Sequence, residues 1–175
     1  MATHSILFAV AEGGYNGSNA IVNNTSQFYL DLGKTSSYAT LTLSDTSAGE
    51  NLLDYGTVNG LTVRVEDAYQ TVPEGAVPAN TFDTAILHTS SDGFTDAITT
   101  TPPSADEAAN IEIGGSTNTW GKTWSTSDIN NMQVRLNNPA EPHGGDSIAL
   151  LATFVYVIVD LSLIHISEPT RLGMI

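Results

Sequence analysis

The sequence predicts an all-β fold: an antiparallel two-sheet sandwich of the jelly-roll type with one short helical turn. Many short segments alternate apolar and polar residues, which is the period of a half-buried strand. Gly, Ser, Thr and Asn are plentiful between those segments, as expected for polar turns. The chain has 175 residues and is 41% hydrophobic, which is enough to bury the core of one domain.

The first half of the chain contains four predicted strands. An apolar segment at residues 5–11 gives the first, and residues 27–32 give the second. Residues 38–43 alternate between apolar and polar side chains, and residues 61–66 do so most cleanly of all. The Asn-Gly pair at residues 59–60 stands directly before the fourth strand and predicts a tight turn there.

The second half continues the same pattern of strands and turns. Further strands are predicted at residues 84–89, 95–99, 110–113, 132–136 and 154–159. The complete pattern predicts about eight to ten strands, the last of these segments being the closing one. Ser125 is followed three residues later by Asp128, which is the spacing of a capping box and predicts a short helical turn near residues 126–131.

Charge and composition exclude several classes of function. Lys and Arg total 5 against 19 Asp and Glu, a formal net charge of −14, so the chain lacks the cations that a nucleic-acid site needs. With no cysteine, it has neither a disulfide framework nor a thiolate metal site. The apolar run at residues 148–159 is shorter than the roughly 20 residues of a membrane-spanning helix. We therefore expect neither nucleic-acid binding nor membrane insertion.

The two ends of the chain need separate treatment. No Lys or Arg precedes the apolar segment at residues 5–11, so the sequence predicts no signal peptide. At the other end, residues 161–171 resemble the in-frame translation of a transposase-type sequencing adapter. The sequence therefore predicts a single β-sandwich domain over residues 1–160, followed by a non-native tail over residues 161–175 that replaces the native residues after Asp160.

Several motifs occur in the order of a known family. They are Tyr-Ala-Thr at 38–40, Asn-Gly-Leu at 59–61, Gly-Gly-Ser-x-x-x-Trp-Gly-x-Thr-Trp-x-x-x-Asp-Ile-Asn at 114–130, and a Val-rich closing strand. This pattern resembles jelly-roll-like β-sandwich domains of tailed-phage virion and tail structural proteins and related metagenomic proteins. Its structural signature falls on Trp120, Gly121, Trp124 and Asp128. The apolar segment 5–11 and the Pro-containing segment 72–79 depart from the pattern.

The resemblance implies a non-enzymatic component of a phage virion or tail. Such a protein would be made in the host cytoplasm, lie on the surface of the virion, and act by presenting a surface. Its partners would be other virion proteins or further copies of itself in a homo-oligomer. Edge strands would provide the contacts, because their unpaired backbone groups can pair with another strand.

A carbohydrate-binding module for attachment to a host-surface glycan is the alternative. Trp120 and Trp124 are more readily explained as core residues, since a glycine follows the first and the helical corner follows the second. The sugar-facing candidates are instead Tyr15, Tyr55 and Tyr69, which lie in polar stretches. Exposed aromatic rings in a row would favour glycan binding, whereas two buried tryptophans without an aromatic platform would favour assembly.

A calcium-dependent adhesion domain is the third hypothesis. Candidate oxygen ligands for calcium are Asp92, Asp96, Asp106, Glu141 and Asp146. Nothing spaces them like an EF-hand loop, and acidic turns explain them equally well. No other cofactor is expected.

The sequence predicts no enzymatic activity and no catalytic residues. The four histidines, at positions 4, 88, 143 and 165, are scattered, and the Gly-x-Ser-x-Gly nucleophile motif is absent. Glu66-Asp67 and Asp106-Glu107 are adjacent carboxylate pairs, which are more typical of solvated loops than of a glycoside hydrolase.

Overall fold

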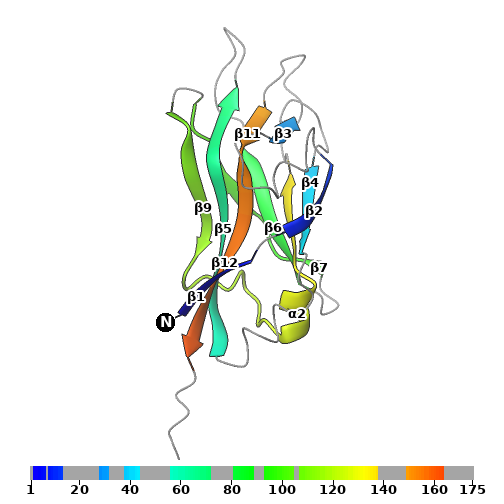
Figure 1. Cartoon of the computed structure of the whole chain (residues 1–175), viewed down its shortest axis with the longest axis vertical. Coiled ribbons are helices and arrows are strands. Elements are labelled where there is room, and N and C mark those ends of the chain that lie inside the picture. Colours follow the sequence, from blue (N-terminus) through cyan, green and yellow to red (C-terminus); the bar gives the residue numbers. More distant parts are fainter. Residues whose placement is uncertain are drawn as a thin grey trace, which may run out of the picture.

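The computed structural model confirms an antiparallel two-sheet β-sandwich with one short helix (Figure 1). The structure describes residues 2–6, 8–13, 28–31, 38–43, 56–71, 81–88, 93–104, 107–137 and 149–163. Among them, no helix has the length and apolar character needed to span a membrane.

The first sheet is built around one long strand, β5. Strand β9 pairs with one side of β5, while β12 and β11 pair in succession with its other side. Beyond them, β1 pairs with β12 and β3 pairs with β11. The strands are β1 (Ala2–Ile6), β3 (Phe28–Asp31), β5 (Gly56–Thr71), β9 (Ala109–Gly115), β11 (Ala149–Ala152) and β12 (Phe154–Leu163).

The second sheet has the order β2-β4-β10-β6, with β7 and β8 both pairing with the far side of β6. All of its pairs are antiparallel. The strands are β2 (Phe8–Gly13), β4 (Tyr38–Leu43), β6 (Phe82–His88), β7 (Gly93–Phe94), β8 (Ile98–Thr100) and β10 (Gln133–Asn137).

The core lies between the two sheets and follows from the alternation of each strand. In β6 every second residue from Phe82 to His88 is buried, and in β10 Val134 and Leu136 are buried between half-buried neighbours. The same alternation in β5 and β12 turns their aliphatic side chains inward. The largest fully buried side chains are Phe82, Leu41, Leu61, Ile86, Ile129, Met132, Leu136, Leu150 and Val63.

The helix α2 (Thr126–Asn130) confirms the predicted helical turn. Ser125 is its N-cap, and both bonds of the capping box form: the Asp128 backbone N–H donates to Ser125 Oγ, and the Ser125 backbone N–H donates to the Asp128 carboxylate. The helix lies at one end of the sandwich, in the segment that joins β9 to β10 (Figure 1). We call residues 116–132 the corner segment.

Two predictions are wrong: one strand at the start of the chain and one turn near the start of β5. The predicted strand at residues 5–11 is two strands, since β1 ends at Ile6 in one sheet and β2 begins at Phe8 in the other. The predicted turn at 59–60 lies inside β5. Glycine is needed at Gly60 for a different reason: a Cβ there would meet the backbone of Gly115 and Ser116, so the chain passes too close for a side chain.

The strand count also differs from the prediction, because short breaks divide the apolar runs. Twelve strands occur among the described residues. The segment predicted as a strand at 95–99 is a strand only at its end, in β8, and residues 95–97 separate β8 from β7. The closing apolar run gives β11 and β12 on either side of Thr153. Strand β12 continues to Leu163, three residues into the segment that resembles an adapter, and Leu161 is buried there. The origin of that segment stays a prediction.

Candidate functional site

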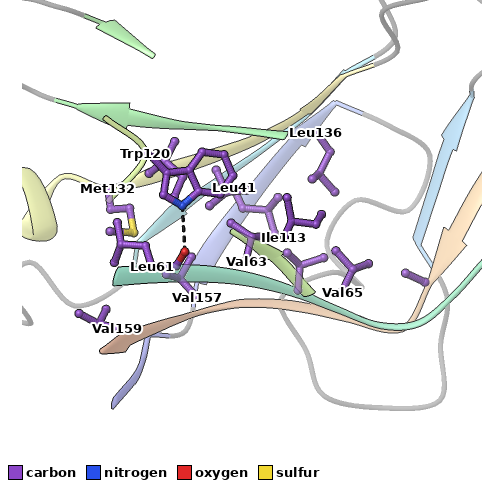
Figure 2. Close-up of a cluster of buried hydrophobic side chains, with 14 of the residues drawn as sticks. Leu41, Leu61, Val63, Val65, Ile113, Trp120, Met132, Leu136, Val157 and Val159 are labelled. Carbon is purple, nitrogen blue, oxygen red and sulfur yellow. Dashed lines mark hydrogen bonds between the residues drawn. The ribbon is translucent and has the colours of Figure 1, made fainter. Parts of the chain in front are cut away.

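Both tryptophans of the corner segment lie in the interior. Trp120 is 6% exposed and its Nε1–H donates to Leu61 O at 2.9 Å, with the indole packed between the sheets (Figure 2). Trp124 is 6% exposed and its Nε1–H donates to Thr119 O at 2.9 Å. Because both rings are buried, neither offers a free face on which a ligand could stack.

The corner segment is closed by a buried histidine from β6. The ring of His88 lies edge-on to Trp124, with a centroid separation of 5.2 Å. Its Nε2 is 2.9 Å from Thr123 O and 3.4 Å from Asp128 Oδ2. Asp128 Oδ2 also accepts a hydrogen bond from Ser125 Oγ at 2.6 Å. These contacts join α2 to the end of the second sheet, so they hold the corner in place.

A connected group of polar side chains lies instead on the outside of the first sheet. In the antiparallel register, Arg64 of β5 stands opposite Glu112 of β9 on one side and Tyr156 of β12 on the other. Residues two apart on a strand share a face, so Glu66 and Phe154 form the next pair along the same surface. We call Arg64, Glu66, Glu112, Phe154 and Tyr156 the β5 outer face.

The polar members of the β5 outer face form one connected chain of contacts. Arg64 Nη1 donates to Glu112 Oε1 at 3.1 Å, and Arg64 Nε lies 3.8 Å from Glu66 Oε1. Tyr156 Oη–H donates to the same Glu66 oxygen at 3.2 Å. The side chains of Arg64, Glu66 and Glu112 are 27%, 26% and 59% exposed, respectively. All three side chains are therefore in contact with water.

One half-buried aromatic ring, that of Tyr156, borders this chain of contacts. The rings of Phe154 and Tyr156 lie 5.4 Å apart at an interplanar angle of 36°. Phe154 is buried and supports the half-buried Tyr156 from one side. Burial raises the pKa of the Tyr156 hydroxyl, the charge of Arg64 opposes that rise, and the carboxylate and hydrogen bond of Glu66 add to it. The hydroxyl therefore stays protonated and acts as a donor to Glu66.

A β-bulge fixes the backbone beside Glu66. The pairing of β5 with β9 shifts register between Val65 and Ala68, and Asp67 adopts a left-handed conformation with φ of 49°. Thr153 secures this bulge: its backbone N–H donates to Glu66 O at 3.0 Å, and its Oγ1–H donates to Asp67 Oδ2 at 2.9 Å. Asn110 Oδ1 accepts from the Asp67 backbone N–H at 3.1 Å.

The outside of the second sheet carries a different arrangement. There the guanidinium of Arg135 lies over the ring of Phe94, 3.9 Å from its centroid. Thr99 Oγ1 donates to Asp83 Oδ1 at 2.6 Å. One face of the Phe94 ring is thus covered by a side chain of the protein itself.

Of the tyrosine and calcium candidates proposed from the sequence, only Tyr69 and Asp96 lie within the described residues. Tyr69 is half-buried in β5, whereas Tyr15 and Tyr55 lie outside the described residues. Of the calcium candidates, Asp96 is exposed, and the other four also lie outside the described residues. Within the described part of the chain, no group of three or more His, Asp or Glu side chains could hold a metal ion. Calcium binding stays a prediction.

Sequence reasoning missed most of the β5 outer face. In the sequence Glu66 is half of an adjacent carboxylate pair, whereas the structure gives the two members separate partners: Tyr156 for Glu66 and Thr153 for Asp67. Arg64 and Tyr156 lie at alternate positions of apolar strands, which predicts that each points outward. The two side chains meet because β5 and β12 pair directly. The order of the strands in a sheet cannot be read from their alternation.

No protein-family model matches the chain, and no curated protein is similar to it. Among solved structures, it is similar to a low-affinity xylan-binding module from Roseburia intestinalis, with 16% identity, coverage of 92% of this chain and 95% of that one, and a TM-score of 0.41. It is also similar to a family 11 carbohydrate-binding module from Clostridium thermocellum in complex with a β-1,3-1,4-mixed-linked tetrasaccharide. That match has 12% identity, covers 94% of this chain and 90% of that one, and has a TM-score of 0.38.

Proposed function

We propose that the chain is a non-catalytic carbohydrate-binding module whose ligand lies on the β5 outer face. The observation that carries the proposal is the connected set of Glu112, Arg64, Glu66 and Tyr156 on one solvent-facing surface. A sugar presents hydroxyl groups that both donate and accept hydrogen bonds, and C–H groups that pack on aromatic rings. Carboxylates accept, the guanidinium donates, and the tyrosine supplies the ring.

The rigidity of this surface supports the proposal. Each polar group is held by a neighbour on an adjacent strand, and the bulge secured by Thr153 fixes the backbone of Glu66. A ligand that binds such a surface does not have to order the side chains first, so less affinity is lost to conformational entropy.

The virion and homo-oligomer hypotheses stay untested predictions. Burial of Trp120 and Trp124 meets the first half of the criterion that favours assembly. On β9, however, the exposed carboxylate of Glu112 lies on a strand that pairs only with β5 among the described residues. A charge on an edge strand disfavours pairing with a second copy. A glycan-binding face remains compatible with location on a virion.

A matched pair of arginine variants tests the proposed face. Arg64→Ala removes the central donor of the β5 outer face, and Arg135→Ala removes an arginine from the outside of the other sheet. We expect binding to polysaccharides in affinity gel electrophoresis, followed by titration calorimetry on those that retard the protein. Arg64→Ala should weaken binding about tenfold or more, and Arg135→Ala less than about twofold.

Thermal melting provides the control for folding. Both arginines are partly exposed, so each substitution should lower the free energy of unfolding by only about 1 kcal/mol or less. Equal loss of binding in both variants would place the ligand elsewhere. A chain that binds no polysaccharide in a broad panel, while well folded, would overturn the proposal.

A further inference from the structure

We infer that the ligand of the β5 outer face is an uncharged glycan, and that the face itself discriminates against acidic polysaccharides such as uronates and sulfated glycans. The inference rests on the proposed function and adds the chemical class of the ligand. It follows from how the charges on this surface are arranged.

Arg64 is the cation of the β5 outer face, and two carboxylates already surround it. Glu112 accepts its Nη1–H at 3.1 Å, and Glu66 lies 3.8 Å from its Nε. One positive and two negative charges leave this trio with a formal charge of −1. The exposed carboxylate of Asp67, next to Glu66 in sequence, adds a further negative charge.

An anionic sugar would meet two obstacles on this surface. To pair with Arg64 it would have to compete with Glu112, which accepts from Nη1, and with Glu66, which lies beside Nε. It would also stand next to carboxylates of its own sign, in the field of a chain whose formal charge is −14. Both effects lower the affinity for an acidic ligand without affecting a neutral one.

Neutral hydroxyl groups suit the same arrangement. Glu112 is 59% exposed and accepts a single hydrogen bond from Arg64, so a free lone pair of its carboxylate can accept from a sugar hydroxyl. The ion pair can stay in place while this bond forms. No charge has to be removed from water on the ligand side, which keeps the cost of desolvation low.

Pairs of polymers with the same backbone, one acidic and one neutral, provide the test. Binding is measured for carboxymethyl against hydroxyethyl cellulose, and for pectin against its carboxyl-reduced form, within a wider panel of neutral and acidic polysaccharides. We expect the neutral member of a bound pair to bind at least about tenfold more tightly. Its affinity should change less than about twofold between about 0.05 and 0.5 M NaCl, because no ion pair forms with the ligand.

Two variants with the same change in net charge distinguish the effect of the charges on the β5 outer face from the effect of the overall charge of the chain. Glu112→Gln should narrow the preference for the neutral polymer about threefold or more, whereas Glu107→Gln, an exposed carboxylate outside the face, should leave it unchanged. Equal narrowing by both variants would assign the discrimination to overall charge and overturn the inference. Tighter, salt-sensitive binding of the acidic polymers would overturn it while leaving the proposed function standing. Absence of binding to every polymer would overturn the proposed function itself.

Discussion

The corner segment and the β5 outer face satisfy their polar groups in opposite ways. In the corner segment, the indole N–H of Trp120 and the carboxylate of Asp128 bond to other parts of the chain and are buried. On the outer face, Glu112 has most of its surface in water, and Arg64 and Glu66 are partly exposed. The two tryptophans of this chain therefore specify its interior, whereas the outward positions of its strands face the solvent.

This comparison separates stability from recognition. Substitutions in the corner segment should lower the free energy of unfolding and leave the affinity of the folded protein unchanged. Substitutions on the outer face should lower the affinity and leave the free energy of unfolding almost unchanged.

Replacing Trp120 with alanine should have the largest effect. The substitution removes a buried indole from the space between the sheets and leaves the carbonyl of Leu61 without its donor, at a cost of about 3–5 kcal/mol. Urea unfolding followed by circular dichroism measures the loss. If Trp120→Ala instead kept its stability and lost polysaccharide binding, the tryptophan would belong to the binding surface and the separation would fail.

A pair of glycines sharpens the same point within the backbone. Gly60→Ala places a Cβ against the backbone of Gly115 and Ser116, which cannot move aside easily, and should cost about 2–3 kcal/mol. Gly93→Ala is the control: it has open space around the new Cβ, and its φ of 72° alone should cost about 1 kcal/mol. Equal losses of stability, measured by urea titration, would show that close approach at Gly60 is unimportant.

Asp128→Ala should have an intermediate effect. It breaks both the capping box with Ser125 and the contact with His88, and loss of a helix cap costs about 1–2 kcal/mol. Asp96→Ala, at an exposed position, is the control and should change stability by less than about 0.5 kcal/mol. A lower melting temperature for Asp128→Ala with unchanged affinity is the expected result. Unchanged melting would contradict a structural role for the corner.

The sequence predicts the sandwich and its helix because both depend on local patterns. Alternation marks the strands at 38–43 and 61–66, and the spacing of Ser125 and Asp128 marks α2. Breaks between strands are harder to predict from the sequence. The break between β1 and β2, for example, depends on which sheet each strand joins.

The candidate site is predicted less well, and for a physical reason. Along the chain, Glu112 lies 48 residues from Arg64, and Tyr156 lies 92 residues from it. No local spacing therefore relates the three. Their contact arises only when β9, β5 and β12 pair in that order. Because every outward position of a strand looks alike in sequence, neighbours across strands are the missing information.

The smallest effect is expected at Tyr156, where pH changes the stability that a residue of the outer face contributes. Burial raises the pKa of its hydroxyl, so the folded state favours the protonated form. This contribution to stability is complete below the ordinary tyrosine pKa of about 10 and is lost as pH rises through the higher folded value. Tyr156→Phe lacks the group, so the stability of the wild type relative to this variant should fall between about pH 8 and pH 10.5. Urea unfolding at both pH values measures it. A difference that does not change, or grows, over this interval would show that Tyr156 is not held as a protonated donor to Glu66.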